Sequence, residues 1–142
     1  MTPFCIGSGA GYAGDRIDPA RDLAYSGRLQ ALVFECLAER TIALAQGRRS
    51  ADPTQGYDPL LGDRLRAVLP ACLRHKTRVI TNMGAANPLA AGQAAVAVAR
   101  ELGLSRLRVA VITGDDVLSW AQTHDAAVLD SPGGLKDIRA NL

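Results

Sequence analysis

Residues 78–88, Arg-Val-Ile-Thr-Asn-Met-Gly-Ala-Ala-Asn-Pro, decide the fold when they are taken with the segments that follow. The β-branched start, residues 78–82, predicts a strand. Residues 89–102 are rich in alanine and predict a helix, which Gly103 ends. A further strand is predicted at 107–113, Leu-Arg-Val-Ala-Val-Ile-Thr. This strand–helix–strand order is typical of a βαβ unit and indicates a parallel sheet.

The N-terminal half extends the same alternation. Residues 4–6 predict a short strand that leads into the glycine-rich segment 7–15. The apolar run 31–36 predicts a strand buried on both faces, although its composition also allows a helix. The remaining predicted elements are helices at 18–27 (with Gly27 as the glycine at the helix end), 37–46 and 60–73 (the last interrupted or ended near Pro70), a loop at 47–59, a helix at 117–122 and a short strand at 126–129.

The fold class that follows is α/β, with a parallel sheet built from βαβ units. Right-handed crossovers place helices on both faces of such a sheet or on the outside of a barrel. We therefore expect an open three-layer sandwich or part of a larger α/β fold. At 142 residues the chain fits a single domain, 1–142, in which residues 119–142 form a loosely packed tail.

Composition limits the function classes. The 16 basic and 14 acidic residues give a net charge of +2, which is too balanced to favour a nucleic-acid partner. No apolar run approaches the roughly 18 residues that a membrane span needs. The three cysteines match neither a disulfide framework nor a zinc motif, and no signal peptide is evident. We therefore expect a cytoplasmic protein that binds neither nucleic acid nor membrane.

Polar residues follow each predicted strand, where parallel α/β proteins bind their ligands. Asp15 ends the glycine-rich segment, Glu35 ends the second strand and Asp115 follows the last. These three are the candidate catalytic acids and bases, since a partly buried carboxylate at such an edge can exchange protons with a ligand. A structural ion pair with arginine is the alternative for Glu35.

The glycine-rich segment has its own candidate role. Gly9, Gly11 and Gly14 satisfy the G-x-G-x-x-G pattern, and Glu35 follows at the spacing of a dinucleotide fingerprint. That motif requires a helix to open inside the loop, whereas Asp18-Pro19 predicts a later start and Asp15 adds negative charge. The three glycines are therefore candidate substrate-binding residues that cradle a carboxylate or an acyl-CoA phosphate, or else form a plain turn.

Two further groups complete the candidate site. Asn82, Gly84 and Asn87 are candidate substrate-binding residues, because paired amides beside a helix N-terminus suit a carboxylate or carbonyl ligand. Asn87-Pro88 also fits an ordinary N-cap. Asp115 and Asp116 are candidate ligands for a divalent cation such as Mg²⁺, or one of them caps the next helix.

The motifs taken together resemble the acyclic terpene utilisation (AtuA) family, also catalogued as a bacterial domain of unknown function. The matching segments are 7–15, 34–39 (Phe-Glu-Cys-Leu-Ala-Glu), 81–88 and 113–118 (Thr-Gly-Asp-Asp-Val-Leu), in the family's order and at similar spacing. Family members are much longer, so the resemblance implies an N-terminal portion: a fragment, a truncated product or a split subunit. It also implies a place in the catabolism of citronellol and geraniol through acyl-CoA intermediates.

These observations favour an enzyme subunit or fragment that acts on a branched carboxylate or acyl-CoA by hydratase- or lyase-type proton transfer. The alternatives are a non-catalytic module that pairs with another subunit, and a dinucleotide-binding domain. An isolated part of a larger fold leaves apolar surface exposed, so we expect a homo-oligomer or a complex with a partner subunit.

Overall fold

A computed structural model gives the structure of the protein and describes residues 3–138. The chain divides into two compact units, Met1–Val111 and Ile112–Leu142. Unit 1 contains the sheet and its helices, and unit 2 contains two short helices. The expectation of one domain with a loose tail over residues 119–142 stays a prediction.

Unit 1 is built on a parallel sheet of three strands in the order β1-β2-β3, which confirms the predicted α/β fold class. Two of the strands lie where the sequence predicts them, β2 at Ala31–Phe34 and β3 at Arg78–Thr81. The first strand, β1 at Ile6–Ala10, begins two residues later than predicted and takes in part of the glycine-rich segment. In register, Gly7 pairs with Leu32, which pairs in turn with Val79.

Close packing explains why glycines occupy β1. A Cβ atom at Gly7 would lie 2.5 Å from Cδ1 of Leu29, and one at Gly9 would lie 2.8 Å from the ring of Phe34. Real contacts of a Cβ atom are much longer, so only glycine, which has no Cβ, fits at these two positions. These two glycines therefore serve the packing of the sheet, whereas the sequence pattern suggested a loop.

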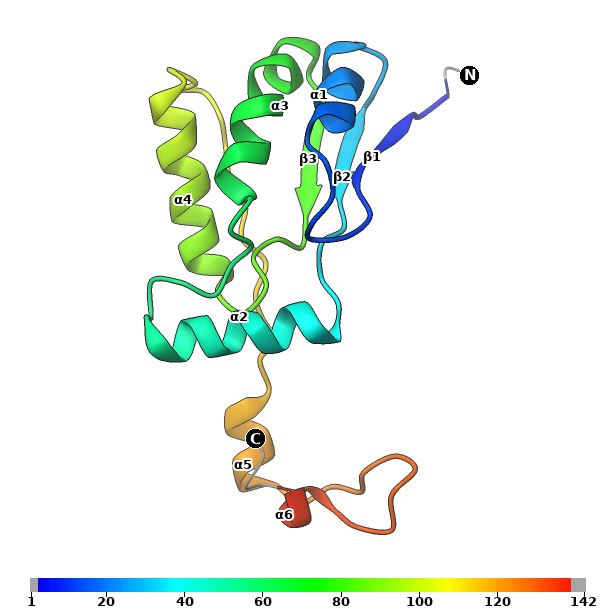
Figure 1. Ribbon diagram of the computed structural model, residues 1–142, viewed down its shortest axis with the longest axis vertical. Coiled ribbons are helices and arrows are strands. Elements are labelled where there is room, and N and C mark those ends of the chain that lie inside the picture. The colour runs from blue at the N-terminus through cyan, green and yellow to red at the C-terminus, as the bar shows by residue number, and fades with distance from the viewer. Residues whose placement is uncertain (1–2, 139–142) are drawn as a thin grey trace. The chain divides into compact units, whose positions relative to one another are not determined.

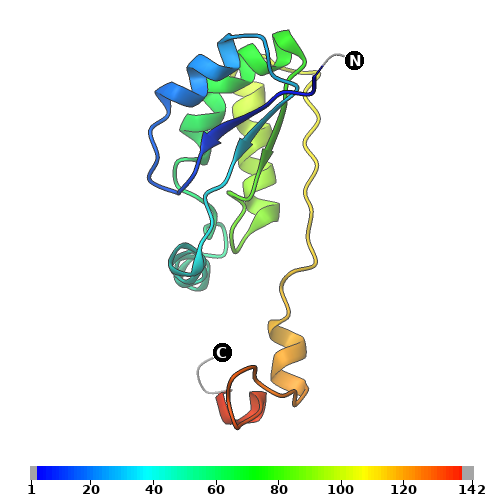
Figure 2. The ribbon, with the colours of Figure 1, turned by 90° about the vertical axis from the view of Figure 1, so that its right-hand side faces the viewer.

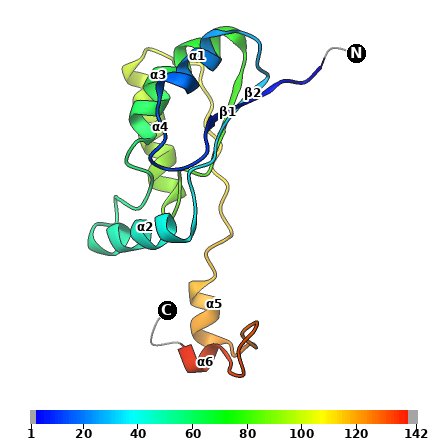
Figure 3. The ribbon, with the colours of Figure 1, turned by 45° about the vertical axis from the view of Figure 1, so that its right-hand side comes forward.

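Three helices pack on one face of this sheet, as Figures 2 and 3 show. They are α1 (Asp18–Tyr25), α3 (Leu61–His75) and α4 (Pro88–Glu101). Helix α1 contacts β1 and β2, α3 contacts β3, and α3 lies between α1 and α4. Among the described residues, unit 1 is thus a two-layer arrangement, in place of the three layers that an open sandwich would have.

Helix α2 (Glu39–Ala51) has a different position. It lies beyond the carboxyl ends of the strands and runs across them in Figure 1. Its last turns are fixed by Arg49, whose Nη1 donates a hydrogen bond of 2.7 Å to the carbonyl of Ala86. The helix extends to residue 51, so the predicted loop at 47–59 is wrong in its first part. Good helix formers around Gly47 carry the helix through that glycine.

Local sequence signals account for the ends of several helices. Gly27 follows α1 with a φ of +68°, a conformation that favours glycine, as its predicted role at the helix end requires. Asn87 is the N-cap of α4, since its side-chain oxygen accepts a hydrogen bond from the amide of Ala90. The prediction that Pro70 ends or interrupts its helix is wrong, because α3 continues through it to His75. The buried neighbours of Pro70, Leu69 and Ala71, hold the helix against the core.

The strand predicted at 107–113 is wrong: among the described residues, this segment joins no sheet. Residues 107–111 run as an extended chain along α4, where Val111 contacts the helix at Gly92. The β-branched sequence favours an extended backbone, but a strand also needs a hydrogen-bonding partner. Residues 112 and 113 belong to unit 2.

The two faces of the sheet differ in burial. On the helix side, Leu32 and Phe34 of the central strand are fully buried in the core with residues of α1, α3 and α4. On the opposite side, Ile6 is 64% exposed and Ile80 is 53% exposed. Alternation of side chains along each strand separates the two sets. This second face therefore exposes isoleucines on β1 and β3, whereas Ala31 of the central strand is buried on it.

Unit 2 consists of α5 (Leu118–Thr123), α6 (Leu135–Ile138) and the turns between them. The rings of Trp120 and His124 stack with centroids 4.8 Å apart. The predicted strand at 126–129 is reduced to one isolated bridge between Ala127 and Gly134. Considering both units over the described residues 3–138, no helix is long and apolar enough to cross a membrane.

Candidate functional site

Glu35 and Asn82 meet at the carboxyl edge of the sheet. The first directly follows β2 and the second directly follows β3. The Nδ2 atom of Asn82 donates a hydrogen bond of 2.9 Å to Oε1 of Glu35. The same oxygen accepts a hydrogen bond of 3.1 Å from the amide of Leu37. The Asn82 contact first, and the Leu37 amide second, lower the pKa of Glu35, because both stabilise the charged form.

The other end of the Asn82 side chain is also held. Its Oδ1 accepts a hydrogen bond of 2.7 Å from the backbone amide of Cys36. Each polar atom of the Asn82 amide thus contacts the segment that follows β2. The carboxylate of Glu35 is therefore fixed in place and ionised at neutral pH. It is exposed, whereas the sequence predicted a partly buried carboxylate, and its lowered pKa makes it an available but weak proton acceptor.

The Asp15 carboxylate closes the glycine-rich loop that follows β1. Its Oδ2 accepts a hydrogen bond of 2.9 Å from the amide of Gly11, and its Oδ1 accepts one of 3.0 Å from the amide of Arg16. The half-buried Asp15 side chain therefore accepts the hydrogen bond of the Gly11 amide, which an external anion would need for its own binding. In this conformation the loop therefore holds an internal carboxylate.

The three glycines of the G-x-G-x-x-G pattern have different surroundings. Gly9 lies inside β1 against Phe34, and Gly14 lies beside the ring of Tyr12. Gly11 is exposed in the loop, and a Cβ there would meet nothing within 4 Å. Helix α1 begins only at Asp18, after the loop. The dinucleotide motif requires a helix that opens inside the glycine loop, and this geometry does not provide one.

Gly84 and Asn87 serve the turn between β3 and α4. A Cβ at Gly84 would lie 3.0 Å from Cα of Pro88, so the turn is too close for a side chain. Asn87 Nδ2 donates hydrogen bonds of 2.8 Å and 2.7 Å to the carbonyls of Pro53 and Gln55. Since its Oδ1 caps α4, the Asn87 amide already has partners at both ends in this structure.

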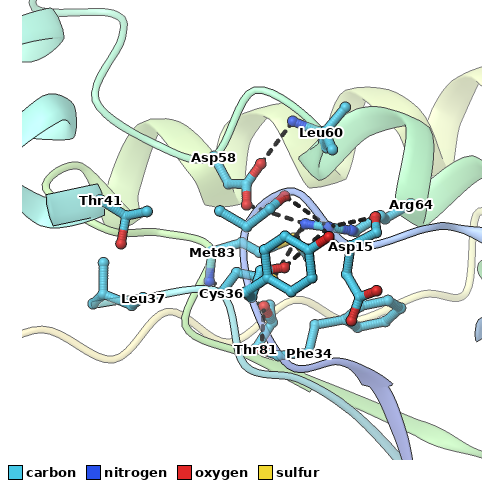
Figure 4. Close-up of polar contacts among 12 residues, drawn as sticks. Asp15, Phe34, Cys36, Leu37, Thr41, Asp58, Leu60, Arg64, Thr81 and Met83 are labelled. Carbon is cyan, nitrogen blue, oxygen red and sulfur yellow. Dashed lines mark hydrogen bonds and ion pairs between the residues drawn. The ribbon is translucent and has the colours of Figure 1, made fainter. Parts of the chain in front are cut away.

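The sequence reasoning missed the residue at the centre of this region, Arg64 of α3, shown in Figure 4. Arg64 is 0% exposed, and its Nη1 lies 3.1 Å from Oδ2 of Asp58, itself 5% exposed. Nη1 also lies 3.2 Å from the sulfur of Cys36 and 3.6 Å from that of Met83. Nη2 donates to the carbonyls of Ala13 at 2.8 Å and Asp15 at 3.1 Å.

A signal for Arg64 exists in the sequence. Leu61, Leu65 and Val68 repeat at helical spacing and are buried, and position 64 falls on the same face. A charged residue on an apolar helix face must find partners, because burial of an unpaired charge is strongly unfavourable. The pattern could have singled out Arg64, but only the structure shows its partners.

Cys36 is buried beside this arginine. Burial raises the pKa of its thiol to about 11, against the opposing effect of the nearby Arg64 charge. The thiol is therefore neutral at physiological pH and poorly nucleophilic.

The last two candidates, Asp115 and Asp116, belong to unit 2. Oδ1 of Asp116 accepts a hydrogen bond of 3.1 Å from the amide of Leu118, the first residue of α5. This is the helix-end role that the sequence offered as an alternative to metal binding. Over residues 3–138, no three His, Cys, Asp or Glu side chains are grouped so that they could hold a metal ion.

Comparison with known proteins gives one match. A family model described as "Acyclic terpene utilisation family protein AtuA" matches residues 4–140. No curated protein and no solved structure is significantly similar to the chain. The match covers the glycine loop, the Glu35–Asn82 pair, the Arg64 cluster, and Asp115 and Asp116.

Proposed function

The chain belongs to the acyclic terpene utilisation family AtuA, and on this premise we propose that it acts on a branched carboxylate or its coenzyme A thioester by proton transfer. The family gives the chain a role in acyclic terpene utilisation. The substrate class and the proton transfer are our proposal. The observation that carries it is the ionised Glu35 carboxylate, held by Asn82 at the carboxyl edge of the sheet.

Glu35 is suited to the role of base. Its carboxylate is exposed, so a ligand can reach it, and two hydrogen bonds fix its orientation. In a hydratase-type step, water would add across a carbon–carbon double bond conjugated to the carbonyl. Glu35 would take one proton from the water while the water oxygen bonds to the β-carbon. The resulting enolate would then take that proton back from Glu35 at the α-carbon.

The proposal gives supporting roles to neighbouring residues. Asn82 would orient the base, and the half-buried Asp15 would contribute a second carboxylate from the loop after β1. The Gly11 amide of the glycine loop would bind an oxygen atom of the ligand only in place of the Asp15 carboxylate that it contacts in this structure. Gly11 and Gly14 are exposed, whereas Gly9 is buried in β1.

The test uses the purified chain and geranoyl-CoA, the thioester of a branched acyclic monoterpene acid. We expect saturable binding by calorimetry and slow hydration detected by mass spectrometry. Glu35→Gln should remove turnover and keep binding, because the amide is isosteric but cannot accept the proton. Glu39→Gln is the matched control: it is an exposed acid in the first turn of α2, four residues away. Equal turnover in both variants would remove Glu35 from the mechanism.

One observation favours a second candidate function, a non-catalytic module that assembles with another subunit. The sheet face opposite the helices exposes the apolar side chains of Ile6 and Ile80 in unit 1, and exposed apolar side chains contribute to interaction surfaces. If this function holds, light scattering should detect a homo-oligomer that Ile80→Lys dissociates. A monomer at high concentration would contradict self-assembly through this face.

A further inference from the structure

One buried guanidinium contacts all three segments that follow the strands (Figure 4). Arg64 reaches the loop after β1 through the carbonyls of Ala13 and Asp15. It reaches the end of β2 through the sulfur of Cys36, and the turn after β3 through the sulfur of Met83. The three segments come from residues far apart in the sequence, and Arg64 is a common contact of all of them.

The arginine is itself held in place. Asp58 compensates its charge at 3.1 Å, and both side chains are buried. Asp58 is fixed in turn, because its Oδ1 accepts a hydrogen bond of 2.7 Å from the amide of Leu60. Its own amide donates to the carbonyl of Met83 at 2.8 Å. The pair therefore links the start of α3 to the turn after β3.

Each of these segments carries a candidate site residue. The carbonyl that Arg64 binds in the first segment is that of Asp15 itself. Cys36 is adjacent to Glu35, and its amide bonds to Asn82. Met83 is adjacent to Asn82. A movement of Arg64 would therefore displace all three candidates, although Arg64 touches none of their functional side-chain atoms.

We propose that Arg64 is a positioning residue of this site: with Asp58, it sets the relative positions of Asp15, Glu35 and Asn82. The role of these residues in ligand binding rests on the proposed function. The role of Arg64 in placing them does not. A solely structural arginine would stabilise unit 1 as a whole, whereas a positioning arginine acts first on the strand-end segments.

The test separates these two roles by hydrogen exchange at single amides. The amide of Gly11 reports on the Asp15 contact, the amide of Cys36 reports on the Asn82 contact, and that of Leu32 in the core of β2 reports on global unfolding. Arg64→Lys keeps the charge but loses the forked donor geometry. We expect exchange at Gly11 and Cys36 to rise about tenfold or more, with a smaller change at Leu32.

A matched control lies on the same helix. Arg66 is exposed and pairs with Asp63 and Glu101, so Arg66→Lys should leave all three amides unchanged. If Arg64→Lys does not fold, the double variant Arg64→Met with Asp58→Asn removes the charges together, which is better tolerated than one unpaired buried charge. It should fold and show the same loss of protection at Gly11 and Cys36.

A binding measurement with geranoyl-CoA then tests whether the positions that Arg64 sets for the candidate site residues matter for ligand binding. We expect the affinity of the folded Arg64 variant to fall about tenfold, and that of Arg66→Lys to stay unchanged. A folded Arg64 variant with unchanged protection at Gly11 and Cys36 would overturn the proposal, whatever the binding result. If the unmodified chain does not bind the probe, the proposed function fails, and hydrogen exchange still decides the role of Arg64.

Discussion

The side-chain amide of Asn82 bridges from the end of β3 to the end of β2, with Nδ2 donating to Glu35 at 2.9 Å. Its Oδ1 accepts from the amide of Cys36, so both ends of one side chain bind consecutive residues of the neighbouring segment. The bridge joins residues 47 positions apart in the sequence. It holds the Glu35 carboxylate in its charged form, and this has a measurable consequence for pH dependence.

Acidification should weaken the contribution of Glu35 to stability. The Asn82 and Leu37 hydrogen bonds lower its pKa below the ordinary 4.5, so this contribution is fully present above about pH 4.5. It is lost as the pH falls through the lowered folded-state pKa. Thermal melts of the unmodified chain and of Glu35→Gln should therefore differ most above pH 4.5 and converge in more acidic buffer.

Asn82→Ala provides the control for that measurement. Without the Nδ2 donor, the pKa of Glu35 should rise toward its ordinary value, which NMR titration of the side-chain carboxyl carbon detects. An unchanged titration midpoint in this variant would show that Asn82 does not set the ionisation of Glu35.

The cysteines should differ in reactivity. Cys36 and Cys72 are buried, and burial raises the pKa of each thiol to about 11. Cys5 is half-buried near the N-terminus. At pH 8, a thiol reagent should therefore modify one cysteine in the folded chain and all three after denaturation. Rapid modification of all three in native buffer, detected by intact mass, would contradict this burial.

Substitution by alanine should destabilise the protein at one glycine of the motif and have little effect at another. At Gly9 a Cβ would approach the ring of Phe34 to 2.8 Å, so Gly9→Ala should lower the free energy of unfolding by about 1–3 kcal/mol. At Gly11 a Cβ would meet nothing within 4 Å, so Gly11→Ala should change stability by less than about 0.5 kcal/mol. Urea denaturation measures both. Equal losses would contradict the packing of β1 against Phe34.

The extended segment beside α4 should tolerate proline. Within the described residues, the amides of 108–111 make no backbone hydrogen bond, so Ala110→Pro should cost less than about 1 kcal/mol. Val33→Pro in the central strand β2 should cost about 3 kcal/mol or more. A large loss in Ala110→Pro, seen in the same denaturation assay, would show that this segment pairs with another strand.

Much of the fold follows from local sequence signals. The β-branched residues of β3, the Asn87-Pro88 start of α4 and the Gly27 end of α1 act within a few residues, so sequence patterns predict them. The same local logic placed Glu35 and Asn82 after adjacent strands. It failed for Pro70, where core contacts on either side of the residue maintain the helix.

What the sequence determined by itself is the three strands that form the parallel sheet and the candidates that follow them, because strand propensity and the βαβ order are local properties of the chain. Only the tertiary structure decided which of those candidates meet. The Asn82 bridge to Glu35 and the contacts of Arg64 join distant segments, and no short-range pattern encodes them. The tertiary structure also decided that residues 107–111 form no strand, since a strand forms only where another strand is present to accept its hydrogen bonds.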